Sequence, residues 1–459
     1  MVLNRKIYTI LIFGLLISFA YSFLTVIKFD KYNKSNNHLM VRGDIQLIWE
    51  EASDFKKDFF ERDKNIFEAG KEYTRTYLPS KILAFYSQIF NLKILNENNL
   101  VGINNYGKIF YLFFQSLIYY FSIFYFFIKF KYYTQDNIVA YYSLFFLSIE
   151  PTILQWHSSF WTESFYLSIQ NFLLGFVLDK KKTLPKYFII GLIFGLMFLQ
   201  KTVAVFLIFF FIFFVFINEK SKKLLKISFL LFGYSLIIFF IIQNNYVKTD
   251  KRYIMPLQTK DAHYASLIPM IYEKNKNYEE FKKLINDEEE WKKSTNYNYQ
   301  NYSDIIKFYE YKQSKAIDIM LKNKIIVIEI YLKKIFHHAL LNPVQVYYWH
   351  EYNNSKYENI EYHLSEDKKK WLFWRIIYSV AVYLIMLLGL IKIFTDQKDK
   401  NYYFFILLII FYYVFMLGWL GNTRYFITSY ILLSVFFGHG ASLAIRYLKK
   451  YYYLSINKK

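Results

Sequence analysis

Apolar residues gather in ten stretches along the chain, and polar or charged segments separate each stretch from the next. A helix needs about 20 residues to cross the roughly 30 Å hydrocarbon core of a bilayer, and most of these stretches approach that length. The fifth and sixth are shorter and meet at Gln200-Lys201-Thr202, which predicts one tight hairpin. The stretches cover residues 7–26, 109–130, 138–155, 159–178, 187–199, 203–217, 227–242, 372–393, 403–420 and 425–443. This pattern predicts an all-α polytopic membrane protein with about ten transmembrane helices.

Lysine and arginine in the short connections lie almost entirely on one side of this predicted bundle. Such residues accumulate in cytoplasmic loops, so the bias predicts a multi-pass protein of the cytoplasmic (inner) membrane with both termini in the cytoplasm. Two basic residues, Lys201 and Arg424, fall in short connections on the opposite side. Two long polar segments, residues 29–77 and 243–370, fall on that outer side as well.

Both outer segments contain amphipathic patterns. In the first, Ile45-Gln46-Leu47-Ile48-Trp49 and the phenylalanines that follow lie at helical spacing, which predicts helices in the headgroup layer. The second is expected to be mostly helical, with an amphipathic run over residues 325–341, and a short apolar helix is expected over residues 81–90. The chain is thus divided into an N-terminal transmembrane module (1–242), a large extracytoplasmic segment (243–370) and C-terminal transmembrane helices with a basic tail (371–459).

Composition agrees with the membrane interpretation and excludes several chemistries. Hydrophobic residues make up 55% of the chain and aromatic residues 23%. The net charge of +21 could indicate nucleic acid, but the excess lies in the predicted cytoplasmic loops and tail, where anionic headgroups explain it better. Without cysteine there is no disulfide framework, thiolate zinc site or thiol nucleophile. No phosphate-binding glycine loop, zinc-binding histidine pair or nucleophile elbow occurs, which argues against an ATP-driven pump or a soluble-type hydrolase.

Several acidic residues fall at the predicted outer face. Asp44 follows the first stretch, where a carboxylate could meet substrate or serve as a helix N-cap. Glu163 lies at the outer turn between the third and fourth stretches, near His157 and Glu150-Pro151. Because ionisable groups in a membrane need a partner, an aqueous cavity or a function, these residues predict a polar cavity. The simpler alternatives are that Glu163 caps its helix and that Pro151 kinks the one before it.

Lys201 and Arg424 are exceptions to the accumulation of basic residues in the predicted cytoplasmic connections. A phosphate or pyrophosphate at the outer surface would give each a partner, arginine through its planar fork and lysine as a point charge. The alternative is that both side chains snorkel to lipid headgroups.

The order and common sidedness of these short motifs resemble the GT-C superfamily of integral-membrane glycosyltransferases, particularly the protein mannosyltransferase and lipid A aminoarabinose transferase-like branch. The similarity covers about residues 1–245 and 370–446. The motifs are Arg42-Gly43-Asp44, Tyr77-Leu78-Pro79, Pro151, Thr162-Glu163, Lys201-Thr202 and Arg424-Tyr425. Where the family often has a proline pair, this chain has Leu78-Pro79-Ser80, and Asp44 has no adjacent carboxylate, so the base and a divalent metal stay open.

The resemblance implies transfer of a sugar from a polyprenyl-phosphate donor to a lipid, glycan or protein acceptor at the outer face, with inversion at the anomeric carbon. It implies no nucleic-acid partner and no certain cofactor. The residues it assigns are Asp44 and Glu163 to catalysis, Lys201 and Arg424 to the donor phosphate, and His157, Arg75, Tyr77 and Tyr425 to substrate binding.

Two other functions stay open. A transporter or flippase could use Glu150, His157 and Glu163 as an ion relay, although the two halves show no evident inverted repeat. An O-antigen polymerase or ligase would share the many spans and the large outer loop. Such an enzyme is expected to carry several arginines in that loop, and here it carries only Arg252.

Overall fold

The computed structural model describes residues 5–34, 78–90, 105–157, 163–179, 183–249, 252, 254, 258–298, 301–340, 366–396, 400–417 and 423–456. Every regular element in these ranges is a helix. The long outer helices are α11 (Gln258–Asn275), α12 (Tyr278–Ser294), α13 (Tyr302–Lys322) and α14 (Lys324–Leu340). The others are α1 (Arg5–Lys34), α3 (Leu78–Ile89), α4 (Asn105–Thr134), α5 (Asn137–Ile149), α6 (Pro151–His157), α7 (Glu163–Val177), α8 (Leu184–Gln200), η2 (Thr202–Phe206), α9 (Leu207–Asn218), α10 (Lys223–Thr249), α16 (Glu366–Asp396), α17 (Asn401–Leu417), α18 (Thr423–Tyr430), η5 (Ile431–Leu433) and α19 (Ser434–Ile456).

In the part of the chain that the structure describes, five helical segments are long and apolar enough to cross a membrane. They cover Arg5–Leu24, Gly107–Thr134, Lys223–Gln243, Ile376–Thr395 and Phe426–Lys450. Within the described residues, each of the ten apolar stretches falls on one helix or on consecutive helices, and the hairpin hinge at Lys201 separates α8 from η2. The prediction of an all-helical fold is confirmed for the described residues. That all ten stretches cross the membrane stays a prediction.

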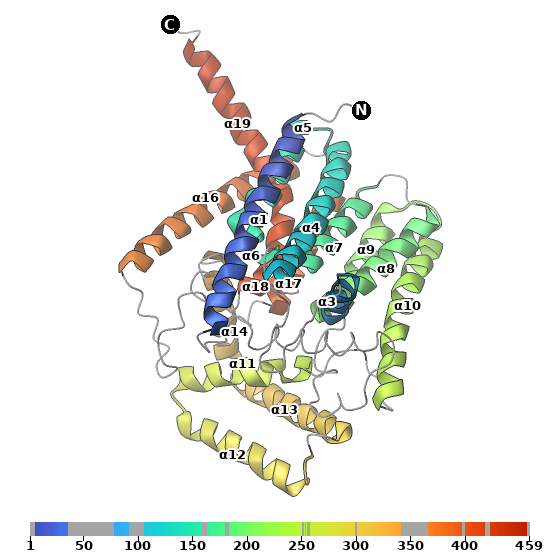
Figure 1. Cartoon of the computed structure of the whole chain (residues 1–459), viewed down its shortest axis with the longest axis vertical. Coiled ribbons are helices and arrows are strands. Elements are labelled where there is room, and N and C mark those ends of the chain that lie inside the picture. Colours follow the sequence, from blue (N-terminus) through green and yellow to red (C-terminus); the bar gives the residue numbers. More distant parts are fainter. Residues whose placement is uncertain are drawn as a thin grey trace.

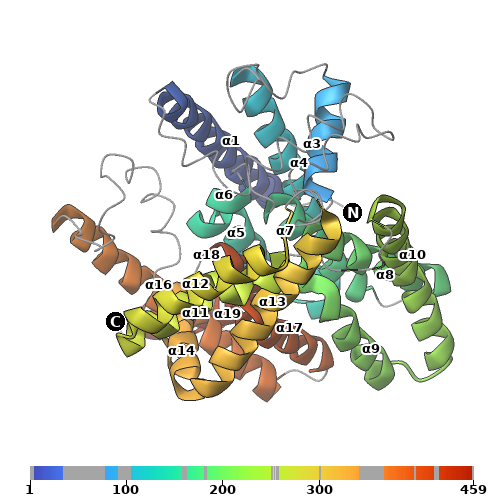
Figure 2. The same ribbon diagram turned by 90° about the horizontal axis from the view of Figure 1, so that it is seen from below.

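The apolar helices form one bundle, and α11–α14 lie across one of its ends (Figure 1; Figure 2). The first helix begins and the last helix ends at the other end of the bundle (Figure 1). At that other end, Asp179 binds Lys129 at 3.2 Å and Lys186 at 2.6 Å, and Arg446 binds Asp136 at 2.5 Å. Asp179 comes just after the C-terminus of α7, so the N-terminus of α7 points toward α11–α14.

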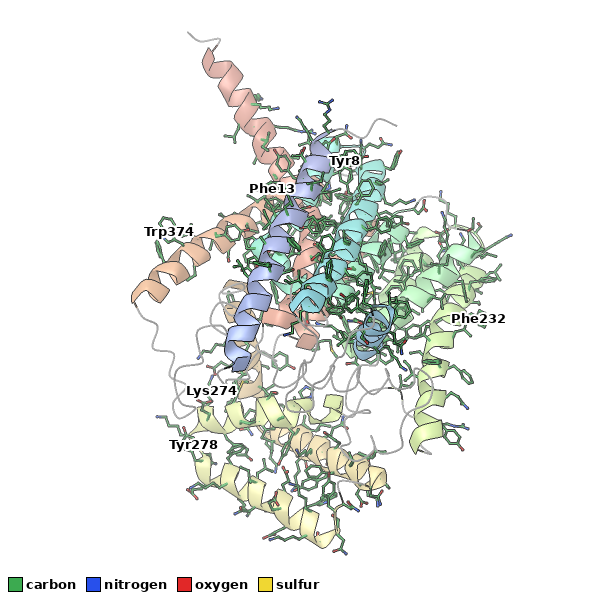
Figure 3. All side chains as sticks on the ribbon, in the orientation of Figure 1. Tyr8, Phe13, Phe232, Lys274, Tyr278 and Trp374 are labelled. Carbon is green, nitrogen blue, oxygen red and sulfur yellow. The ribbon has the colours of Figure 1, made fainter. Side chains whose placement is uncertain are left out.

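Large apolar side chains cover the outer surface of the bundle. Tyr8 and Phe13 on α1, Phe232 on α10 and Trp374 on α16 project outward and are about half exposed or more (Figure 3). In the interior, Tyr119 and many other aromatic rings are fully buried in one continuous core. A surface this apolar is expected of helices that lie in lipid, because there the bilayer takes the place of water.

Glycines allow close backbone contact at two helix crossings. Where α8 crosses α10, a Cβ on Gly191 would overlap the backbone at Leu230. Where α16 crosses α19, a Cβ on Gly389 would overlap the backbone at Phe436, and one on Gly440 would do so at Ile385. Small residues let helix backbones approach closely in membranes, where packing rather than water exclusion drives helix association. These crossings attach the peripheral helices α10 and α16 to the bundle.

The helices α11–α14, here called the outer unit, have a small apolar core of their own. Leu267 and Ile271 of α11 pack against Leu284, Ala316 and Ile330 from the other three helices. The prediction that residues 243–370 are mostly helical is confirmed for the part that the structure describes. The amphipathic helices predicted between residues 45 and 60 lie outside the described residues.

Candidate functional site

The helix break before Pro151 is stabilised by tyrosine hydroxyls. Proline has no N–H, so the Leu147 carbonyl loses its usual intrahelical donor. The Tyr119 hydroxyl donates to that carbonyl at 2.8 Å, and the Tyr120 hydroxyl donates to the Ser148 carbonyl at 2.7 Å. Unsatisfied backbone groups are costly inside a membrane, so these bonds explain how the chain tolerates a break there.

Glu150, at the break itself, is only 2% exposed and accepts hydrogen bonds from four groups. The donors and their distances are the Thr152 hydroxyl at 3.1 Å, the Ile153 N–H at 2.9 Å, the Tyr378 hydroxyl at 3.3 Å and the Tyr430 hydroxyl at 3.2 Å. Tyr378 belongs to α16 and Tyr430 to α18. The carboxylate therefore links the α5–α6 break to both of these helices.

Glu163 and Lys201 form a buried ion pair. The Lys201 Nζ lies 2.6 Å from the Glu163 Oε1, and the exposed fractions of the two side chains are 8% and 0%. The two residues are 38 positions apart, and each lies at a turn that the sequence places on the outer side. Lys201 therefore points into the protein, which contradicts the snorkelling alternative for this residue.

Local helix geometry favours both charges of this pair. Glu163 is the first residue of α7, where the helix dipole favours a negative charge. Lys201 follows the last residue of α8, where the dipole favours a positive charge, and its N–H donates to the Met197 carbonyl at 2.8 Å. The pair thus joins the N-terminus of one helix to the C-terminus of the next. The capping interpretation of Glu163 and its pairing with Lys201 are compatible.

One tyrosine ring lies against the ion pair, and other tyrosines bond that ring or the backbone after Lys201. The Lys201 Nζ lies 5.5 Å from the centre of the Tyr166 ring, within cation–π range, and the Tyr166 hydroxyl bonds the Tyr413 hydroxyl of α17. In η2, directly after Lys201, the Val203 carbonyl accepts from the Tyr412 hydroxyl. The Val205 carbonyl accepts from the Tyr234 hydroxyl at 3.0 Å. At both helix breaks, therefore, tyrosine hydroxyls from neighbouring helices donate hydrogen bonds to backbone carbonyls.

The helix that carries Arg424 and Tyr425 packs against the helix that begins at Glu163. This helix, α18, packs against α6, α7 and α14, and the Gln170 side-chain amide of α7 donates to the Thr428 carbonyl of α18 at 2.9 Å. The fold thus joins the helix of Arg424 to the helix that starts at Glu163 and to the one that ends at His157. The side chains of His157, Arg424 and Tyr425 are not among those described.

Three other predicted site residues, Asp44, Arg75 and Tyr77, lie outside the described residues. Within the described part, no group of three or more histidine, aspartate and glutamate side chains is arranged to hold a metal ion. Two residues next to the ion pair, Tyr166 and Tyr413, were not identified from the sequence. With 46 tyrosines in the chain, no sequence signal distinguishes these two from the rest.

No protein family, curated protein or solved structure matches this chain. A function therefore has to be argued from the residues themselves and from where the fold brings them together. The fold brings together a buried lysine–glutamate pair and the Tyr166 ring, on a helix that packs against α18. The ion pair is the candidate functional site.

Proposed function

We propose that this protein is a glycosyltransferase that uses a polyprenyl-phosphate-linked sugar as its donor. The acceptor is a lipid, glycan or protein at the outer face of the cytoplasmic membrane. The observation that best supports the proposal is the Lys201–Glu163 pair, which holds a cation at the start of α7, and α7 packs against the helix that carries Arg424. A lipid phosphate offers both cations a common partner while its chain stays in the bilayer.

In the proposed reaction the acceptor hydroxyl attacks the anomeric carbon of the donor sugar. The new carbon–oxygen bond forms as the bond to the lipid phosphate breaks, and the configuration at the anomeric carbon inverts. Asp44 takes the proton from the hydroxyl. Lys201 and Arg424 stabilise the negative charge that develops on the departing phosphate.

Glu163 has a different role in this proposal from the catalytic one assigned to it by the sequence resemblance. Its Oε1 atom binds Lys201, so Glu163 is a positioning residue that fixes where the ammonium group sits. The lipid phosphate would share that ammonium group with Glu163. Tyr166 supports the same arrangement, because its ring lies against the ammonium and its hydroxyl is tied to α17.

The proposal is tested with purified protein in vesicles that contain a panel of polyprenyl-phosphate-linked sugars. Transfer is expected with at least one donor. Asp44→Asn should lower its rate by about 10²–10⁴-fold, the usual loss when a general base is removed, because asparagine can still cap a helix. Asp54→Asn, in the same segment, serves as the matched control and should keep the rate. If no donor is used while the protein moves protons or lipids across the vesicle membrane, the transporter alternative is correct.

The proposed sidedness has a separate test. The chain contains no cysteine, so an introduced cysteine can be labelled without background. A cysteine at Ser303 should react with an impermeant thiol reagent in intact cells, and one at Ser221 should not. Labelling at Ser221 alone would place the candidate site on the cytoplasmic side and remove the basis for an extracytoplasmic acceptor.

A further inference from the structure

Helix α14 carries an exposed apolar stripe. Ile325, Ile328, Leu332 and Phe336 follow one another at intervals of three and four residues, so they share one face of the helix. Their exposed fractions are 82%, 59%, 54% and 67%. A contiguous apolar face of this kind on a folded protein marks a surface that contacts something else.

The stripe is not the face that packs within the outer unit. Ile330 is buried in the core of that unit, and Ile326, Val327 and Tyr331 pack around it. The apolar residues of α14 therefore occupy two sides of the helix, one toward α11 and one outward. Since the inner face already accounts for the packing of the unit, the stripe needs a separate partner.

The position of α14 in the fold indicates which partner this is. The helix lies between α18 and the α11–α13 part of the outer unit, and it packs against both α16 and α18 (Figure 1). Part of α16, Ile376–Thr395, is apolar and long enough to cross a membrane. Near its start, Phe373 and Trp374 are 60% and 65% exposed, and Trp374 projects from the bundle surface (Figure 3). The stripe thus lies on a helix that contacts a segment long and apolar enough to cross a membrane.

The charges on α14 also favour contact with the membrane surface. Its one acidic residue, Glu329, is paired with Lys274 of α11, which leaves the charges of the exposed Lys324 and Lys333 in excess. An amphipathic helix with lysines beside an apolar face lies in the interface, with its apolar side chains among the acyl chains and its lysines at anionic headgroups. A second copy of this chain would instead bring these like charges together.

We infer that α14 lies in the headgroup layer of the membrane next to α16, with its stripe in contact with the acyl chains. The outer unit then sits on the bilayer surface and is anchored there as well as by its contacts with the bundle. This inference depends on the membrane insertion of α16 and not on the proposed glycosyl transfer.

Site-directed spin labelling of the full chain tests the inference. A nitroxide is attached to Ile328→Cys or Leu332→Cys, and the protein is placed in vesicles of phosphatidylethanolamine and phosphatidylglycerol. The matched control is Ile285→Cys on α12, an apolar residue of the same unit with 47% exposure. The ratio of collisions with oxygen to collisions with a water-soluble nickel chelate should be severalfold higher for the two stripe labels than for the control.

Two results would overturn the inference. Equal ratios at all three positions would mean that the stripe faces water. Protection from both reagents, with line broadening between labels, would mean that a second copy of the chain covers it. Hydrogen exchange of α11, measured on each variant, verifies that the outer unit is folded; since the labelled residues are outside its core, the variants are expected to keep that protection.

Discussion

Removing one charge of the Glu163–Lys201 pair is expected to destabilise the protein far more than removing both. With Glu163→Gln the ammonium of Lys201 stays buried without its carboxylate, and with Lys201→Met the carboxylate stays buried alone. The loss of one partner of a buried pair costs about 3–5 kcal/mol, because an uncompensated charge is left in a medium of low dielectric constant. Replacing both partners with neutral residues of similar size is often close to neutral.

The free energy of unfolding is measured for the wild type, the two single variants and the double variant in lipid bicelles. From these values the double-mutant cycle should give a coupling energy of about 3 kcal/mol or more between the two positions. The control pair is Glu279 and Lys282 on α12, whose side chains are 86% and 70% exposed. An exposed helix pair of this kind should give a coupling energy of about 0.3–0.5 kcal/mol.

Single-variant effects that simply add would refute the reasoning, because they would mean that the two charges do not interact across a buried contact. The same variants also separate folding from catalysis. The double variant should recover most of its stability and still fail to transfer sugar, since Lys201 would no longer be present to meet the donor phosphate. Recovery of both stability and transfer would leave the pair with a purely structural role.

Three further predictions concern other parts of the chain. A Cβ on Gly14 would lie 2.7 Å from the Ser148 carbonyl oxygen at the α5–α6 break, so Gly14→Ala should lower the free energy of unfolding by about 1–3 kcal/mol. Arg424→Lys keeps the charge but loses the planar fork, so donor use should fall well below that of Arg446→Lys at the other end of the bundle. Burial lowers the pKa of His263 on α11 from 6.5, so the unfolded chain binds more protons than the folded one at acid pH. Hydrogen-exchange protection of the outer unit should therefore drop as the pH falls below 6.5, and His263→Gln should remove that drop.

The helices were largely predictable because the hydrophobic pattern is strong and long. Each apolar stretch falls on a helix, and Pro151 and Lys201 lie at breaks as their sequence contexts indicated. The pairing of Glu163 with Lys201 was not predicted from the sequence. The sequence predicted that both belong to one outer face, but it assigned them separate roles. Only the packing of α7 against α8 brings the two side chains together.

The tyrosines that bond the backbone at the helix breaks could not be predicted from the sequence pattern. A hydroxyl that bonds a freed carbonyl must come from a neighbouring helix, so its identity depends on how helices are rotated against one another. Tyr412 bonds Val203 across 209 positions. The second apolar face of α14 was hidden for a related reason. Its hydrophobic residues are frequent enough to read as one amphipathic run, and only the contacts of Ile330 show which of them the outer unit buries.

The burial of the Lys201–Glu163 pair governs how dissolved salt acts on this region. Mobile ions weaken the attraction between charges that water can reach, and they screen a buried pair much less. The side chains of Lys201 and Glu163 are 8% and 0% exposed. Their attraction is therefore sheltered from ionic strength, whereas exposed pairs on α12 weaken as the Debye length shrinks to about 10 Å at 0.1 M. Salt would loosen the surface of the outer unit while the two helix ends at the candidate site stay joined.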